Sequence, residues 1–174
     1  PVLDSGELDM DAFKSLLSEK TKLLSLSHIS NALGTINPII EMIALAKEKN
    51  SLVLIDGAQS APHMLVDVQA LDCDFFCFSA HKIYGPTGIG ILYGKKEILE
   101  KMPPYQSGGE MIKEVSFTGT TFNDLPYKFE AGTPNIAAGI GLLSAVEFMN
   151  EIGVENIAQH EAELIRYATK KLKD

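Results

Sequence analysis

The chain has 174 residues, of which 45% are hydrophobic and 22% are charged, a composition typical of a soluble globular domain with enough apolar side chains for a core. Its formal net charge of -8 argues against a nucleic-acid partner, because no basic stripe is available to neutralise phosphates. No apolar run approaches the roughly 20 residues of a membrane-spanning helix and no signal peptide is recognisable, so we expect a cytoplasmic protein without a membrane partner.

The N-terminal part of the chain alternates between helical and extended patterns. The stretch Asp9–Lys20 carries apolar residues at helical spacing, and the apolar run Lys22–Ser27 predicts a strand. Asn37 and Pro38 predict a helix start, since a capping side chain precedes a residue whose fixed φ suits the first turn. This helix should extend to about Lys49. Its pattern places four apolar side chains on the inner face: Ile39, Ile40, Ile43 and Ala44.

Three further segments predict strands: Leu52–Ile55, Phe75–Phe78 and Ile89–Tyr93. The first is a continuous run of leucine and β-branched residues, which is typical of a strand buried on both faces of a parallel sheet. Strands and helices in alternation favour an α/β architecture with a mainly parallel sheet and right-handed crossovers.

The alternation stops beyond Met102. A Gly-, Thr- and Pro-rich stretch reaches Asn135, and two helices are expected to follow, over residues 136–150 and from Val154 to the C-terminus. The chain starts without Met and stops without a capping glycine. A sheet of four strands would also keep a long unpaired edge, which native domains avoid. We therefore expect a fragment of a larger domain.

The two cysteines, Cys73 and Cys77, have a C-x-x-x-C spacing that matches no zinc or redox motif. Period-2 alternation would point both side chains to the same side of a strand, as packing residues. Burial raises the pKa of a thiol, so neither cysteine is expected to act as a nucleophile, and no metal site is expected.

Polar clusters follow three of the predicted strands: Ser27–Asn31, Asp56–Gln59 and Ser79–Lys82. Ligands of open α/β sheets bind beyond the carboxyl ends of the strands, so three clusters on consecutive strands indicate a binding site. The glycine-rich segment Gly85–Gly90 has neither the Walker ending nor the dinucleotide spacing. We interpret it as a tight turn into the next strand.

Lys82 and Asp56 are the strongest candidates for chemistry. Lys82 should lie at the rim of the core, where loss of hydration makes its amine a nucleophile for aldehydes. Considered alone, it would more often be a surface lysine with its stem over the core. Asp56 ends a buried strand, where a carboxylate needs a cationic partner, and a protonated pyridine nitrogen is one. The alternative is that Asp56 caps a local turn.

With these residues the sequence resembles the class V aminotransferases, fold type I enzymes of pyridoxal 5'-phosphate (PLP), and more narrowly the SUF-type cysteine desulfurases and selenocysteine lyases. The resemblance rests on four motifs: Ser27–Gly34, Val53–Gln59, Ser79–Gly88 and Phe129–Asn135. It implies the aspartate aminotransferase-like large domain, with three layers α/β/α. Residues 1–150 would be the C-terminal half of this PLP-binding domain, and residues 151–174 would start the helix that leads to a small C-terminal domain.

The resemblance also implies roles for the polar residues. Lys82 would form the Schiff base with PLP and move the α-proton of the substrate. Asp56 would pair with the pyridine nitrogen, and Gln59 would hydrogen-bond the phenolic oxygen. Ser79 and His81 would hold the phosphate.

Further implied roles concern the partner subunit and the substrate. Gly132 and Thr133 would reach the phosphate of the partner's cofactor in a homodimer, and Asn31 would help to bind the substrate carboxylate. The implied reaction removes sulfur from L-cysteine and leaves L-alanine and an enzyme persulfide, with L-selenocysteine as an alternative substrate. A sulfur-acceptor protein would then carry the sulfur toward iron–sulfur cluster assembly. The nucleophilic cysteine and the substrate-binding arginine would lie outside these 174 residues, so the chain alone is expected to be inactive.

Two alternatives stay open. Another class V enzyme, an aminotransferase or a kynureninase-like hydrolase, would present similar strand-end clusters. A non-catalytic α/β binding module is the other alternative, although neither Lys82 nor Asp56 is needed for packing. We expect His28 and His63 to be structural or loop histidines.

Overall fold

The computed structural model describes residues 1–173 and confirms the α/β architecture. The main sheet has the order β1-β2-β3-β4, formed by β1 (Leu23–Ser27), β2 (Leu52–Asp56), β3 (Phe75–Ser79) and β4 (Gly90–Gly94). The first three strands are parallel, whereas β4 is antiparallel to β3. The sheet is therefore mainly parallel, as expected. The short connection between β3 and β4 explains the exception, because a parallel crossover needs a dozen or more residues.

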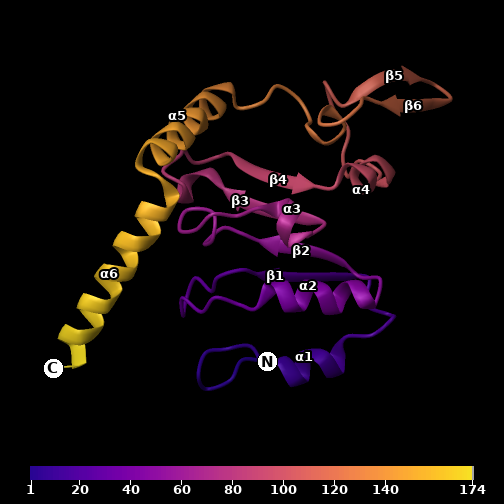
Figure 1. Cartoon of the computed structure of the whole chain (residues 1–174). Coiled ribbons are helices and arrows are strands. Elements are labelled where there is room, and N and C mark those ends of the chain that lie inside the picture. Colours follow the sequence, from indigo (N-terminus) through magenta and orange to yellow (C-terminus); the bar gives the residue numbers. More distant parts are fainter. Residues whose placement is uncertain (174) are drawn as a thin grey trace.

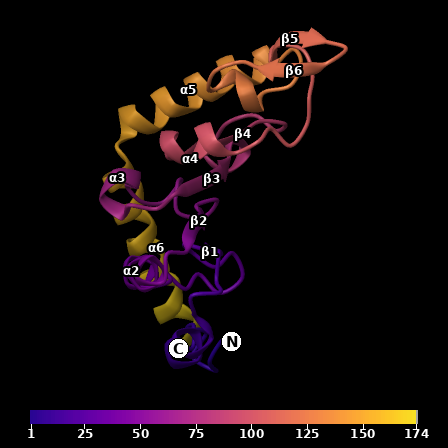
Figure 2. The same ribbon diagram turned by 90° about the vertical axis from the view of Figure 1, so that its right-hand side faces the viewer.

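The helices are α1 (Met10–Leu16), α2 (Ile39–Glu48), α3 (Val68–Leu71), α4 (Lys96–Lys101), α5 (Ile136–Ile152) and α6 (Val154–Lys173). Helices α2 and α3 lie on one face of the strands β1–β3 (Figure 2). Helix α6 runs along the side of the sheet on which β1–β3 end, at the left in Figure 1. This helix thus passes over the edge where the sequence predicts a site.

The core lies between α2 and the sheet. Its buried residues are Ile39, Ile43, Ala46, Val53, Ile55, Cys73 and Phe76. The predicted inner face of α2 is partly wrong, because Ile40 is 74% exposed and Ala44 is also exposed. Met42 and Ala46 are buried in their place, since the stripe at i, i+3, i+4 and i+7 from Ile39 faces the sheet.

The ends of the predicted helices also differ in detail. Helix α1 stops at Leu16, because the backbone becomes extended at Leu17. Helix α2 starts within one residue of the predicted position, but Asn37 does not cap it. The Asn37 Nδ2 instead donates a hydrogen bond of 2.7 Å to the carbonyl of Ser27. This side chain therefore ties the loop after β1 to the end of the strand.

Several elements were not predicted. They are the short helices α3 and α4, the 3₁₀ turns η1 (Ala80–Lys82) and η2 (Tyr127–Phe129), and a hairpin of β5 (Ile112–Ser116) and β6 (Gly119–Phe122). The two predicted C-terminal helices are confirmed as α5 and α6, with the chain turning at Gly153 (φ 86°). Asp174, the last residue of the predicted C-terminal segment, lies outside the described residues.

Within residues 1–173, no single helix is both long and apolar enough to cross a membrane. Helices α5 and α6 meet the length and composition requirement only when taken together, and the pair is bent by 72°.

Candidate active site

The carboxyl ends of the three parallel strands lie level with one another. Ser27 pairs with Asp56 across β1 and β2, and Asp56 pairs with Cys77 across β2 and β3. Backbone hydrogen bonds continue the alignment, since the N–H of His28 donates to the carbonyl of Asp56 (2.9 Å) and that of Gly57 to the carbonyl of Cys77 (2.8 Å). The three polar clusters therefore meet at one edge of the sheet, as predicted.

Lys82 stands at the end of η1, directly after β3. Its side chain is half-buried. Within residues 1–173, no carboxylate forms an ion pair with its ammonium group. The expectation that loss of hydration makes this amine a nucleophile stays a prediction.

The turn that follows Lys82 is closely packed. Tyr84 adopts a left-handed conformation (φ 63°), which bulky residues rarely do, and its ring packs edge-on against Phe148 of α5 with 5.6 Å between centroids. A Cβ on Gly85 would lie 2.9 Å from the carbonyl oxygen of Ala80, and Gly88 has φ +79°. The interpretation of the glycine-rich segment as a close-packed turn is confirmed.

Asp56 differs from its expected environment. Its side chain is exposed in this chain, because the burial of β2 does not extend beyond the open strand end. The Oδ1 atom accepts a hydrogen bond of 2.9 Å from the N–H of Ala58. The argument that burial forces Asp56 to find a cation is therefore wrong, and the turn-capping alternative holds for one oxygen. The second carboxylate oxygen has no hydrogen-bond donor within residues 1–173 and can still meet a cation.

The two cysteines occupy different surroundings. Cys73 is fully buried in the core beside Phe76. Cys77 follows Phe76 in β3, so its side chain faces the opposite side of the sheet, and it pairs with Asp56 of β2. The expectation that both point to the same side is wrong, because Cys73 precedes the strand and does not follow its alternation. Burial raises the pKa of both thiols, and the charge of Asp56 raises that of Cys77 further.

An open cleft of about 460 Å³ lies beside the strand ends. Asn31 and Gln59, two predicted site residues, line it together with His63. Its other wall is α6, which contributes Glu161, and the Nδ1 atom of His63 lies 2.9 Å from the Oε2 atom of this glutamate. Glu161 was not predicted from the sequence. It interrupts an apolar stripe of its helix, and this charged position within an apolar pattern can be recognised in the sequence.

The remaining predicted residues divide between two places. Ser79 is half-buried and His81 is exposed, both at the end of β3. Gly132 (φ +75°) and Thr133 belong to the segment before α5, where the N–H of Gly132 donates to the carbonyl of Gly109 (2.9 Å). Their implied role at the cofactor of a partner subunit stays a prediction.

His28 is a structural histidine by its surroundings. Only 7% of its surface is exposed, and its Nδ1 atom has no hydrogen-bond partner within residues 1–173. Burial lowers the pKa of this imidazole, which favours the neutral ring.

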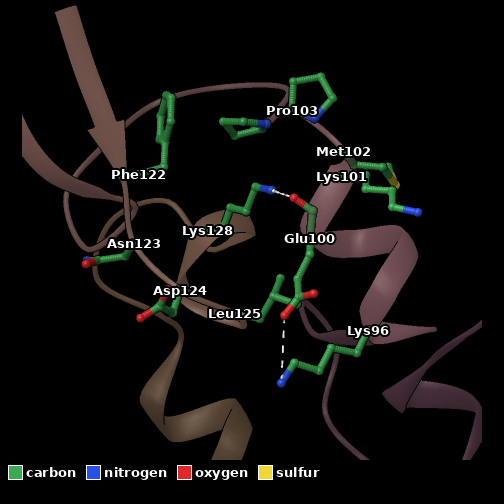
Figure 3. Close-up of a pocket in the computed structure, with 11 residues that line it drawn as sticks. Lys96, Glu100, Lys101, Met102, Pro103, Phe122, Asn123, Asp124, Leu125 and Lys128 are labelled. Carbon is green, nitrogen blue, oxygen red and sulfur yellow. Dashed lines mark hydrogen bonds and ion pairs between the residues drawn. The ribbon is translucent and has the colours of Figure 1, made fainter.

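A larger hollow lies elsewhere, between α4 and the segment that follows β6 (Figure 3). It has a volume of about 840 Å³ and contains none of the predicted site residues. Lys128 points into it, but its Nζ donates to the carbonyls of Leu99 (3.1 Å) and Glu100 (2.8 Å) and so caps the end of α4. The amine of Lys128 therefore serves the fold.

A mainly parallel sheet with a lysine and a carboxylate at its carboxyl edge is the arrangement expected of the large domain of a fold type I PLP enzyme. The chain belongs to the aminotransferase class-V family, whose sequence pattern matches residues 1–174. A cysteine desulfurase of Dickeya dadantii (strain 3937) is 53% identical over 173 residues, which cover 99% of this chain and 42% of that protein. The chain thus spans about two-fifths of the length of this curated relative.

Solved structures agree with this assignment. The apo structure of cysteine desulfurase from Thermococcus onnurineus NA1 superimposes with a TM-score of 0.92 at 38% identity, covering 98% of this chain and 42% of that chain. A mutant of C-DES with glycine covalently linked to the PLP cofactor gives a TM-score of 0.78 at 28% identity, covering 87% and 41% of the two chains.

Proposed function

We propose that this chain is the cofactor-holding part of a PLP-dependent cysteine desulfurase. The observation that carries the proposal is the placement of Lys82 at the same sheet edge as Asp56. Its side chain is half-buried and forms no ion pair with a carboxylate of residues 1–173. The similarity to cysteine desulfurases over nearly the whole chain supports it.

The groups at this edge fit PLP by their chemistry. The cofactor presents an aldehyde, a basic ring nitrogen, a phenolic oxygen and a phosphate. Lys82 offers an amine for the aldehyde, and Asp56 offers a carboxylate with one oxygen still open for the ring nitrogen. Gln59 lies on the turn directly after β2, while Ser79 and His81 provide a hydroxyl and an imidazole for the phosphate.

When bound, PLP supplies an electron sink for the negative charge that develops at the substrate Cα. Asp56 would keep the ring nitrogen protonated, which is what makes the sink effective. Lys82 would take the proton from Cα and return it as the general base and acid of the reaction. Asn31 would orient the substrate through its carboxylate. Helix α6 would exclude water from one side of the cleft that Asn31 and Gln59 line.

The substrate and partners belong to the same proposal. The substrate would be L-cysteine, which gives L-alanine and an enzyme persulfide as products, and L-selenocysteine is the second candidate substrate. The raised pKa of Cys73 and of Cys77 argues against either of them as the persulfide carrier. A sulfur-acceptor protein would take the sulfur toward iron–sulfur cluster assembly. Gly132 and Thr133 would complete the site of a second subunit in a homodimer.

The experiment is a product assay on the full-length protein that contains this chain. The PLP-loaded protein should release sulfide and L-alanine in equal amounts from L-cysteine in the presence of a thiol reductant. Keto-acid-dependent amino transfer without sulfide would identify an aminotransferase instead, and alanine release from kynurenine would identify a kynureninase-like hydrolase. A protein that forms no PLP absorbance band at all would contradict the whole class of reactions.

A further inference from the structure

Glu161 occupies a position of α6 where the helix pattern favours an apolar side chain. Ile157, one turn earlier, is buried, and Leu164 and Ile165 line the cleft beside the strand ends. Residues three and four apart lie on one helix face, so Glu161 points toward the sheet edge. Its side chain is only 34% exposed. A carboxylate in such a place is costly unless it has a partner.

The partner is His63. The Nδ1 atom of its ring lies 2.9 Å from Oε2 and 3.0 Å from Oε1 of Glu161. A neutral imidazole with its proton on Nδ1 can donate this hydrogen bond, as can the charged ring. The contact therefore does not depend on the protonation of His63, and it joins segments 98 residues apart in the sequence.

His63 belongs to the same turn as Gln59. Within this turn the N–H of Ala61 donates to the carbonyl of Gly57 (2.9 Å), and that of Met64 donates to the carbonyl of Ser60 (3.0 Å). Both bonds have helical i to i+4 spacing, which places side chains four residues apart on one side. Gln59 and His63 accordingly line the same cleft. A restraint on His63 is thus a restraint on the position of Gln59.

We propose that the His63–Glu161 pair is a positioning clasp, which fixes α6 across the carboxyl edge of the sheet and sets the place of Gln59. Neither residue is a catalytic residue in this account. The inference rests on the proposed function, in which Gln59 hydrogen-bonds the phenolic oxygen of PLP. Figure 1 shows the course of α6, which leaves α5 at a sharp bend and passes the strand ends as a single long helix.

The test uses the PLP-loaded full-length protein with His63→Ala, Glu161→Ala and the double variant. Glu161→Gln is the conservative variant, since its amide oxygen can still accept the hydrogen bond from Nδ1. His160→Ala is the matched control, because His160 is an exposed neighbour on the same helix. Two quantities are measured: the dissociation constant of PLP, and the pH midpoint of the absorbance change of bound PLP. Thermal unfolding verifies that each variant is folded.

Each alanine variant should weaken PLP binding by about five- to tenfold and shift the pH midpoint, because Gln59 no longer holds the phenolic oxygen. The double variant should match the single variants, since both remove the same contact. Glu161→Gln should retain most of the binding, and His160→Ala should behave as wild type. A folded His63→Ala protein with an unchanged dissociation constant and midpoint would overturn the clasp. A double variant whose loss of PLP affinity equals the product of the two single losses would also overturn the clasp, because the two residues would then act independently.

If an alanine variant does not fold, the comparison of Glu161→Gln with His63→Leu decides, because leucine fills part of the space of the ring but has no hydrogen-bond donor for Glu161. Wild-type midpoints in both would then contradict the inference. If the wild-type protein itself forms no PLP absorbance, the proposed function has failed and the clasp falls with it. A protein that binds PLP with the same dissociation constant and pH midpoint with and without His63 would instead contradict the clasp alone.

Discussion

The carboxylate of Asp56 has two oxygens, and the structure assigns a task to one of them. The Oδ1 atom caps the turn at Ala58, while the other oxygen is open to a cation. Replacement of Asp56 by Ala removes both functions, whereas replacement by Asn keeps the turn cap and removes the charge. The two variants together separate a structural role from an electrostatic one.

We expect Asp56→Ala and Asp56→Asn to lower turnover similarly, by about 10²–10³-fold, the loss typical when an oriented electrostatic contact at a reacting centre is removed. PLP occupancy should fall less than turnover. The measurement is turnover of L-cysteine together with PLP content of the purified full-length variants. Near-normal turnover of Asp56→Asn would show that Asp56 only caps the turn.

The two cysteines of this chain should be dispensable for sulfur transfer. Cys73 is fully buried, Cys77 faces the charge of Asp56, and the pKa of each thiol is raised, mainly by burial. A thiol in such surroundings is a poor nucleophile. The double variant Cys73→Ala/Cys77→Ala should retain the cysteine-dependent persulfide, as measured by mass spectrometry of the full-length protein. Loss of the persulfide from a folded, PLP-loaded double variant would refute this.

The position of the candidate site at the strand ends could be predicted from the sequence, but the surroundings of its residues could not. Lys82 and Asp56 follow apolar strands, and strand ends converge in parallel sheets, so their common edge could be inferred from sequence alone. The exposure of Asp56 could not, because the pattern of a strand does not show what covers its end. The contact between His63 and Glu161 was also missed, since it joins segments 98 residues apart and depends on the direction of α6.

At the scale of the elements, an ion-pair cluster ties helices together around Asp72, the C-cap of α3. Its carboxylate meets Lys47 of α2 and Lys95, the N-cap of α4 (2.5 Å to Oδ1). Lys95 also lies 3.2 Å from Asp74. Hydrogen bonds from Lys47 and then Lys95 lower the pKa of Asp72 from 3.8 to about 2. Burial lowers the pKa of Lys95, but the hydrogen bonds to Asp72 and Asp74 outweigh it and raise that pKa above its ordinary value.

The variant Asp72→Asn should lower the free energy of unfolding at pH 7 by no more than about 1 kcal/mol, because the pair is exposed to solvent. Asn tolerates the left-handed backbone of this position (φ 54°), so the variant tests charge alone. A carboxyl group whose pKa is lower in the folded than in the unfolded protein stabilises the fold at pH values above its unfolded-state pKa. This stabilisation is lost as the pH falls through the folded-state pKa. The difference between variant and wild type should therefore shrink as the pH falls from about 4 toward 2. Urea unfolding across this range measures it, and a difference independent of pH would contradict the assignment to Asp72.

Strong periodicity decided which elements could be predicted. The strands of the main sheet and helices α2, α5 and α6 have clear apolar patterns and were found with small errors at their ends. Helix α3 has four residues and α4 has six, too few to show a period. The strand β5 is exposed along most of its length, so its sequence lacks the alternation that a half-buried strand shows. The antiparallel direction of β4 was not predicted, because the apolar pattern of a strand does not show its direction. The short connection from β3 sets this direction.

At the scale of the whole molecule, the site is open to water. Asp56 and His81 are exposed and Lys82 is half-buried, and apolar side chains of α6 such as Ile165 (66% exposed) stand free beside the cleft. Charged contacts are weakened by exposure to solvent. A cofactor held only by these groups would exchange readily.

The isolated chain should therefore bind PLP much more weakly than the full-length protein. Absorbance titration of both with PLP, at equal protein concentration, measures the two dissociation constants. We expect a saturable band with the full-length protein and only weak binding by residues 1–174. Tight, stoichiometric binding by the isolated chain would show that the groups described here suffice to enclose the cofactor.

The central claim, that Lys82 is the residue that binds PLP covalently, is tested most directly by borohydride reduction followed by peptide mapping. Reduction of the PLP-loaded full-length protein should fix the cofactor on Lys82, the half-buried lysine at the sheet edge that has no carboxylate partner among the described residues. Lys95 and Lys96 are the internal controls, because both are paired with carboxylates near α4. The account predicts the label on Lys82 alone, and a label on Lys95 or Lys96 with Lys82 unmodified would contradict it.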